Sequence, residues 1–346
     1  MLKEIHPSVS VLISPAIELL AAMFRTNCHE KLSNDSDNVP IELEKWVKKT
    51  RSSLTPEMKS ELEVFFSFES FFGLTLIPNT IISEQAEEIE DFLSYLKNMS
   101  PLELITMFTH SGYGTQRKIP THVEDPATLA PFIKEMNFPE VEKWKLTYLC
   151  ANAEDSKKRL VQLIEGFYLQ YFLPELELLT QIHYDSLLEL ESELIDDPQQ
   201  KIAKLLRIDY DYNQEKIIFI PSYFYDSSSC TSYQDESQQL FFVYGVRSIH
   251  INLHEKLNEE KLYERFKALA DENRMKMIKI LNSTPCSGYE LAHKLGLSNS
   301  TISHHVSILS SQGFLSITKQ EKKNLYTVNK DLIKATLESM STFLTD

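Results

Sequence analysis

The fold of this chain is decided by residues 287–312, which read SGYELAHKLGLSNSTISHHVSILSSQ. Ser287 and Glu290 have the spacing of a capping box, in which a hydroxyl and a carboxylate bind the first free N–H groups of a helix. Gly296 is suited to a left-handed conformation that ends this helix, and Ser298 is suited to cap a second one. Two short helices joined by such a turn form a helix-turn-helix, whose second helix can enter the major groove of DNA.

The second helix has two faces of different chemistry when its residues are placed about 100° apart. Ile302, Val306 and Leu309 are expected to point inward. His305 lies beside this stripe, so we expect it to be packed and hydrogen-bonded. The opposite side carries no carboxylate. A helix face that approaches phosphates must lack acidic groups, whereas a face that is only exposed to solvent has no such requirement. We predict DNA contact there by Ser298, Asn299, Ser300, Thr301, Ser303, His304 and Ser307.

Three segments resemble the winged helix of the ArsR/SmtB repressors. FKALADENRMKMIKIL (266–281) resembles their opening helices, ELAHKLGLSNSTISHHVSILSSQGFL (290–315) their helix-turn-helix, and SITKQEKKNLYTV (316–328) their wing hairpin. Together they span about a quarter of the chain. The resemblance implies a transcriptional repressor that binds double-stranded operator DNA.

The tip of the predicted wing carries Lys319, Lys322 and Lys323. These lysines suit phosphates that flank the groove, although a solvated turn can have the same composition. The recognition helix has no Arg, Lys or Gln, so Asn299 is its only side chain suited to a bidentate contact, with an adenine. We therefore expect DNA binding that depends strongly on salt.

A homodimer is implied by the resemblance, because the terminal helix of that family pairs two subunits. Here a last helix is expected to be capped by Asp331, and an earlier helix is expected to begin at Asn258. The apolar stripes of these two helices give the predicted interface, although the last stripe could instead pack on the chain's own N-terminal domain. The residues are Leu262, Phe266, Ile333, Leu337, Met340 and Leu344.

No metal or other cofactor is predicted. The resembling family often has cysteines near the start of the helix-turn-helix, but the corresponding positions here are Ser287 and Tyr289, which are poor ligands for soft metals. Cys286 is one position away and alone. His250 and His254 could share a metal on a helix, yet no third ligand is apparent.

The rest of the chain differs in charge from this C-terminal part. Residues 258–346 carry 12 basic and 10 acidic side chains, whereas residues 1–257 carry 23 basic and 40 acidic ones. The long acidic part should be repelled by nucleic acid. We therefore predict an acidic, mostly helical sensor or dimerisation domain over 1–257 and a winged helix-turn-helix DNA-binding domain over 258–346.

The predicted fold class is mainly α with small β-sheets. A strand is expected over 8–13, followed by a helix capped by Ser14, and further helix starts are expected at Ser83 and Ser100. Residues 208–246 contain β-rich segments around a loop at 226–239, and they could form a small antiparallel sheet that the first strand joins.

Three functions remain open for the N-terminal domain. Its aromatic residues between 223 and 244 could line a cavity for an effector or fill a core, and the domain could instead be a protein-interaction module. A fused enzyme is the other alternative. The region has five glycines and no GxGxxG, GxSxG or HExxH motif, so we expect no catalytic activity. Four scattered cysteines and no long apolar run predict a cytoplasmic protein without a membrane segment.

Overall fold

The computed structural model describes residues 2–32, 39–110, 126–136, 138–206, 216–234, 239–249, 259–320 and 323–345. The chain divides into two compact units. The first contains the described residues up to Ser192 and those from 216 to Ser248, and the second contains Glu193 to Leu206 and the described residues from Ile249 onward. The domain boundary predicted at residue 257 falls among residues 250–258, outside the described residues, and stays a prediction.

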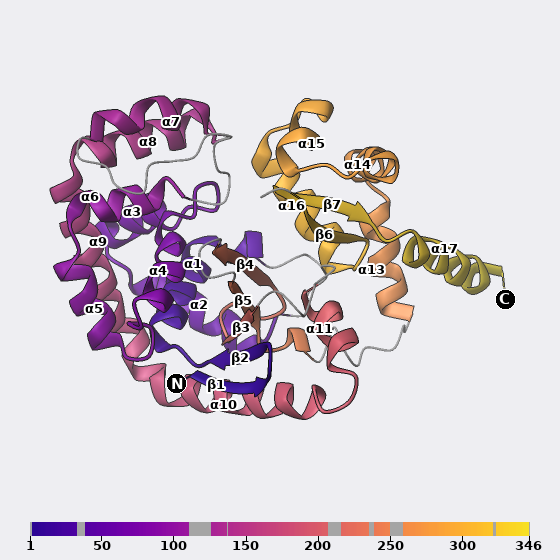
Figure 1. Cartoon of the computed structure of the whole chain (residues 1–346), viewed down its shortest axis with the longest axis horizontal. Helices are drawn as coiled ribbons and strands as arrows, with labels where there is room; N and C mark the ends of the chain where they lie inside the picture. Colours follow the sequence, from indigo (N-terminus) through magenta and orange to yellow (C-terminus); the bar gives the residue numbers. More distant parts are fainter. Residues whose placement is uncertain are drawn as a thin grey trace. The chain divides into compact units, whose positions relative to one another are not determined.

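Most of the first unit is helical (Figure 1), and several helices begin at predicted caps. The Oγ of Ser14 accepts the N–H of Ile17 at 3.1 Å, and the Oγ of Ser100 accepts the N–H of Glu103 at 3.1 Å. In both helices the next residue is a proline, whose missing N–H costs nothing in a first turn. The helices, with the short 3₁₀ and π segments named η, are α1 Pro15–Leu32, α2 Ile41–Ser53, α3 Pro56–Phe65, η1 Phe72–Thr75, α4 Leu76–Ile82, α5 Ile89–Asn98, α6 Pro101–Phe108, η2 Pro126–Leu129, α7 Ala130–Glu135, α8 Glu140–Ala151, α9 Ala153–Phe167, η3 Tyr168–Phe172, η4 Leu173–Glu175 and α10 Leu176–Glu193.

The helix start predicted at Ser83 is wrong. Ser83 ends α4, because its hydroxyl donates to the carbonyl oxygen of Asn79 at 2.7 Å. Glu84 then takes a φ of 59°, and α5 begins only at Ile89. A serine hydroxyl can bond a carbonyl of the preceding turn as readily as the N–H groups of a following one, so its type alone did not fix the direction.

A five-stranded sheet completes the first unit, with the order β1-β2-β3-β5-β4. The strand predicted at 8–13 joins it, but β2 and β5 both pair with β3 in parallel, so the predicted antiparallel arrangement is wrong for these pairs. The segment predicted as a loop at 226–239 contains a strand, β4, which its polar composition concealed. The strands are β1 Leu2–His6, β2 Val9–Leu12, β3 Lys216–Ser222, β4 Ser229–Gln234 and β5 Gln239–Gly245.

The side chains on the two faces of this sheet have different neighbours. Ile218, Ile220, Phe241 and Val243 belong to a large helical core. On the alternate face, the hydroxyl of Tyr244 lies 3.1 Å from the Oγ of Ser186 on α10. Of the aromatic residues predicted to fill either a core or a cavity, Tyr223 is half-buried at the edge of the core. The others are at most 3% exposed: Phe224, Tyr225, Phe241, Phe242 and Tyr244.

Two buried ionisable side chains join α1 to α10. The Oε1 of Glu18 accepts the N–H of Tyr223 at 2.8 Å and that of Phe224 at 3.3 Å, which holds the turn after β3. The Nε2 of His183 lies 3.4 Å from the same oxygen. The two backbone bonds satisfy one oxygen of the Glu18 carboxylate, whereas its Oε2 and the Nε2 of His183 have no hydrogen-bond partner among the described atoms.

The second unit contains a three-helix core, a hairpin and flanking helices. Met277, Leu281, Leu291, Ile302 and Leu309 form its centre. The order of helices and hairpin confirms the predicted winged helix, and the whole chain confirms the predicted fold class, mainly helical with small sheets. Among the described helices, none combines the length and apolar character that crossing a membrane requires. The elements are α11 Pro198–Leu206, α13 Glu259–Leu269, α14 Glu272–Ser283, α15 Gly288–Leu295, α16 Asn299–Ser311, β6 Leu315–Gln320, β7 Lys323–Val328 and α17 Lys330–Thr345.

Candidate nucleic-acid interface

The helix-turn-helix begins at the predicted capping box. The Oγ of Ser287 accepts the N–H of Glu290 at 3.3 Å, and the Oε2 of Glu290 accepts the N–H of Ser287 at 2.8 Å. Gly296 ends α15 with a φ of 66°, which glycine adopts without steric cost. The Oγ of Ser298 then accepts the N–H of Thr301 at 3.1 Å and caps α16. The direction of α16 is therefore set by local bonds at both ends of the turn.

The predicted recognition helix α16 has the two faces expected from its sequence. Ile302, Val306 and Leu309 are buried, while His304 and Ser307 are exposed. The helix contains no acidic residue. The structure therefore gathers the residues predicted to contact DNA on the exposed side and at the N-terminus of one helix, where Ser298 is exposed and Asn299, Ser300, Thr301 and Ser303 are half-buried. Their contact with DNA stays a prediction.

Three hydroxyl groups cluster at the N-terminus of α16. The Oγ of Ser298 lies 2.8 Å from the Oγ of Ser300 and 2.8 Å from the Oγ1 of Thr301. The first turn of a helix also carries a partial positive charge and free N–H groups. Together these groups suit the oxygen of a DNA phosphate, which would fix the position of the helix without reading sequence.

The adjacent histidines of α16 have different environments, as predicted. His304 is exposed, whereas His305 is 8% exposed. Burial lowers the pKa of His305, and the nearby carboxylate of Asp271 opposes this in part. His305 is therefore packed, as predicted. The predicted hydrogen bonding is not seen at its Nδ1, which has no partner among the described atoms.

The wing is a two-stranded antiparallel hairpin joined to the helix-turn-helix at its base. The N–H of Tyr326 donates to the carbonyl oxygen of Cys286 at 2.8 Å. Lys319 pairs with Asn324, and Lys323 pairs with Gln320, at the far end of β6 and β7. Lys322 lies outside the described residues. The backbone thus places two of the three predicted phosphate-binding lysines at the wing tip.

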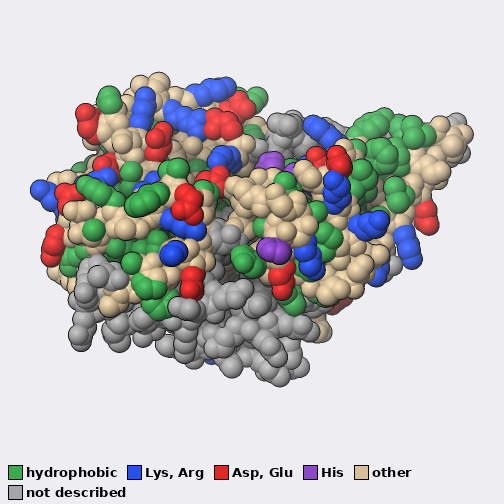
Figure 2. All heavy atoms as spheres, turned by 90° about the horizontal axis from the view of Figure 1, so that it is seen from above, with side chains coloured by type: hydrophobic (Ala, Val, Ile, Leu, Met, Phe, Trp, Pro, Cys, Tyr) green, Lys and Arg blue, Asp and Glu red, His purple; other side chains and the backbone are tan. Residues whose placement is uncertain are grey.

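The six residues predicted for dimerisation divide into two groups. Leu262 and Met340 are 5% and 6% exposed, and Ile333 is half-buried, so these pack within the chain. Phe266, Leu337 and Leu344 are 41%, 49% and 70% exposed. Figure 2 shows apolar side chains gathered over α17, at the right-hand end of the molecule. The last helix is capped by Asn329 and not by Asp331, because the Oδ1 of Asn329 accepts the N–H of Leu332 at 3.0 Å.

The residues considered for a metal site are not brought together by the described structure. Cys286 is buried, and the Nζ of Lys294 lies 3.1 Å from its sulfur. His250 and His254 lie outside the described residues. Within the part of the chain that is described, no cluster of three His, Cys, Asp or Glu side chains could hold a metal ion.

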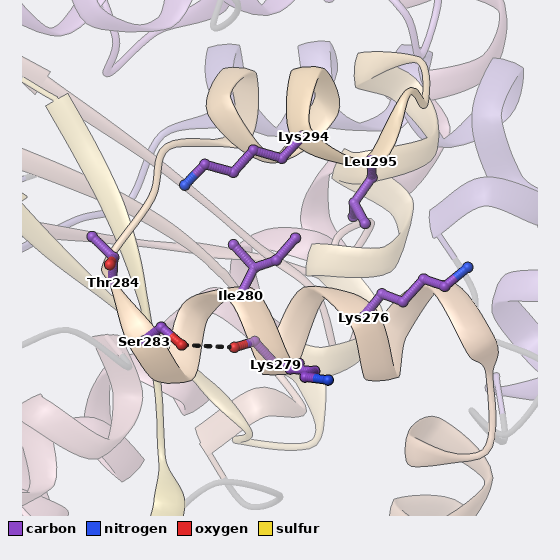
Figure 3. Close-up of a pocket in the computed structure, with 7 residues that line it drawn as sticks. All are labelled: Lys276, Lys279, Ile280, Ser283, Thr284, Lys294 and Leu295. Carbon is purple, nitrogen blue, oxygen red and sulfur yellow. Dashed lines mark hydrogen bonds between the residues drawn. The ribbon is translucent and has the colours of Figure 1, made fainter.

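Two groups of charged residues were missed by the sequence reasoning. Asp271, whose Oδ1 accepts the N–H of Arg274 at the start of α14, also lies close enough to His305 to affect its charge. Lys276 and Lys279 on α14 lie in one groove with Lys294 of α15 (Figure 3). The spacing of three residues between Lys276 and Lys279 indicates a shared helix face, but their nearness to Lys294 depends on tertiary packing.

A capped helix-turn-helix followed by a hairpin wing defines the winged-helix class of DNA-binding proteins. The model of the bacterial regulatory protein family arsR matches residues 271–316. Over 94 residues the chain is 32% identical to the transcriptional activator HlyU of Vibrio cholerae serotype O1, and this alignment covers 27% of the chain and 87% of HlyU. The chain therefore belongs to the ArsR family, which confirms the predicted resemblance and implies DNA binding and a role in transcription regulation.

A solved structure gives a further comparison. NolR from Sinorhizobium fredii is 24% identical to the chain, with a TM-score of 0.22, and the match covers 26% of this chain and 95% of NolR. The arsR model and the HlyU alignment both concern the C-terminal part of the chain, so the N-terminal unit must be considered from its own residues.

Proposed function

We propose that the chain is a homodimeric transcriptional repressor that covers a promoter by inserting α16 of each subunit into a major groove. The observation that supports this most directly is the exposed side of α16, which is free of carboxylates and is held by caps at both ends of the turn. In a twofold dimer the two recognition helices would read half-sites about one helical turn, ~34 Å, apart. The wing lysines would contact the flanking phosphates.

The proposed dimer is supported by exposed apolar side chains on α13 and α17. Phe266, Leu337 and Leu344 are exposed, and the ring of Tyr263 contacts that of Phe343 with centroids 5.4 Å apart. Apolar side chains grouped on neighbouring helices are typical of subunit interfaces. Leu337→Lys should convert the dimer to a monomer in sedimentation experiments, whereas Lys334→Gln on the same helix should not. A monomeric wild-type chain at micromolar concentration would contradict the dimer.

The N-terminal unit is proposed to be a non-catalytic, cytoplasmic sensor whose effector is a protein. Its aromatic residues fill a core, while Val141, Trp144 and Tyr148 are 71%, 72% and 57% exposed on one side of α8. On the face seen in Figure 2, acidic and basic side chains are interspersed. A rise in unfolding temperature caused by the small-molecule fraction of a cell extract, and not by its protein fraction, would argue against a protein effector.

Chromatin precipitation of the tagged chain tests the proposed function. It should enrich a small set of promoters, and deletion of the gene should raise their transcription. HlyU is described as an activator. Lower transcription after deletion would therefore indicate activation here too and would contradict repression, whereas a failure to enrich any promoter would contradict regulation by DNA binding.

A further inference from the structure

Helix α8 of the first unit exposes a line of apolar side chains. Val141, Trp144 and Tyr148 are 71%, 72% and 57% exposed, and Ala151 at the end of the helix is exposed as well. The intervals between these residues are three, four and three positions, so all four lie along one side of the helix. We call these four residues the α8 ridge. Apolar residues at this spacing are typical of a helix that packs against another helix.

The opposite side of α8 already packs on the first unit. Leu146, Leu149 and Cys150 are at most 3% exposed and belong to the core of that unit. The helix contacts α7 and α9 (Figure 1), and the Nδ2 of Asn152 donates to the carbonyl oxygen of Tyr148 at 2.9 Å. The α8 ridge is therefore a second apolar side on a helix whose core-facing side is complete. Exposed apolar side chains gathered in this way mark interaction surfaces.

The charged groups of α8 neutralise one another. The Nζ of Lys143 lies 2.9 Å from the Oε1 of Glu140, and the Nζ of Lys145 lies 2.7 Å from the Oε1 of Glu142. The helix therefore has no net charge, although residues 1–257 carry 23 basic and 40 acidic side chains. By contrast, α10 carries five carboxylates and no lysine or arginine. A second copy of this acidic unit would thus meet less repulsion at α8 than at α10, whereas a strongly charged partner would find no excess charge to bind.

We propose that the α8 ridge pairs with the same ridge of a second copy of the chain. In a twofold antiparallel arrangement, Trp144 of each copy packs on Tyr148 of the other, and Val141 packs on Ala151, so large side chains meet at the centre and smaller ones at the ends. The two aromatic rings expose roughly 300 Å² in each copy. A standard interface buries about 800 Å² on each partner, so the contact belongs to the weak and reversible class.

The α8 contact is distinct from the proposed dimer of α13 and α17, because those helices belong to the second unit. The pairing itself does not depend on the proposed function, since its residues all belong to the first unit. Its regulatory consequence does rest on the proposed function. An effector protein that binds at α8 has to displace the second copy, so effector binding and pairing of the first units exclude each other.

Chemical cross-linking of the full chain, with a cysteine placed beside the α8 ridge, tests this proposal. Thr147 is exposed and lies near the axis of the antiparallel pair, and three of the four native cysteines are buried. A short bis-maleimide should join two copies of the Thr147→Cys variant into a covalent dimer. Adding Trp144→Lys should lower the yield by about fivefold or more, because a lysine ammonium is costly at the centre of an apolar contact. The control variant Ser94→Cys, at an exposed position of α5, should give a low yield that Trp144→Lys does not change.

Two results would overturn the proposal. The Thr147→Cys variant could give no more dimer than Ser94→Cys does, which would leave the ridge to a different partner, or its yield could be unaffected by Trp144→Lys. If Trp144→Lys lowers the stability of the unit, Val141→Lys serves in its place, because Val141 is equally exposed. Sedimentation of the Leu337→Lys variant tests the winged-helix dimer separately, so failure of one contact can be told from failure of the other.

Discussion

The two sides of helix α16 share one backbone and have opposite requirements. Ile302, Val306 and Leu309 are apolar, buried and spaced at helical intervals. His304 and Ser307 are polar and exposed, and the helix bears no acidic group. The buried side is recognised by apolar residues at helical spacing, which the core requires. The exposed side is recognised mainly by the absence of acidic residues. Changes on one side should therefore affect stability, and changes on the other should affect DNA binding.

Ile302→Ala should cause the largest loss of stability among the variants considered. A small loss would contradict the contrast between the two sides of α16. Ile302 is 1% exposed, so its truncation leaves a cavity and should lower the stability of the winged helix by about 2–5 kcal/mol. Hydrogen exchange of the α16 amides, followed by mass spectrometry, measures this loss within the unit. The matched variant Ser307→Ala on the exposed side should stay within about 0.5 kcal/mol of the wild type. Equal protection in the two variants would contradict the assignment of the faces.

Replacing Lys319, Lys322 and Lys323 with Gln should reduce the salt dependence of DNA binding. Each phosphate contact contributes about 0.9 to the slope of log K against log salt concentration, so the slope should become shallower by up to about 2.7. Fluorescence anisotropy over a salt series gives the slope. Lys334→Gln, which removes an exposed lysine of α17, should leave it unchanged. An unaltered slope in the triple variant would assign the wing tip to solvent.

Ser287→Ala should lower the stability of α15 moderately. This variant tests a local contact at the start of the helix-turn-helix, in place of the packing of α16. The hydroxyl of Ser287 accepts the N–H of Glu290, and loss of such a cap costs about 1 kcal/mol. Exchange of the α15 amides should become faster by about fivefold. No change would mean that the capping box seen here does not stabilise α15.

The smallest expected effect is the contribution of His305 to the dependence of stability on pH. Burial lowers its pKa, so the folded state binds its proton less well than the unfolded state. Stability from this group is therefore complete above the unfolded pKa of about 6.5 and is lost as the pH falls below it toward the lowered pKa. Unfolding at pH 7.5 and 5.5 should show a loss that His305→Gln reduces and that His304→Gln, on the exposed side, does not. Equal pH dependence in the two variants would contradict the buried role.

Local signals made much of the winged helix predictable. Ser287, Gly296 and Ser298 act within a few residues of their own position, so the sequence alone contains the interaction. Asp331 shows the limit of this reasoning, because Asn329 two positions earlier has the same capping chemistry and is the actual cap.

The first unit was less predictable because its key contacts join distant residues. The parallel pairs of β3 with β2 and β5 require backbone separated by long stretches of chain, and strand type does not reveal the direction of pairing. Glu18 and His183 meet across α1 and α10 in the same way.

The affinity of the His304→Ala variant for a promoter fragment enriched by chromatin precipitation tests the central claim, that the exposed side of α16 reads DNA. The account predicts a loss of about tenfold or more, comparable to that of a base or phosphate contact, with unchanged α16 hydrogen exchange. His293→Ala removes an exposed histidine of α15 and should bind like the wild type. Wild-type affinity of His304→Ala, or an equal loss in both variants, would contradict the account.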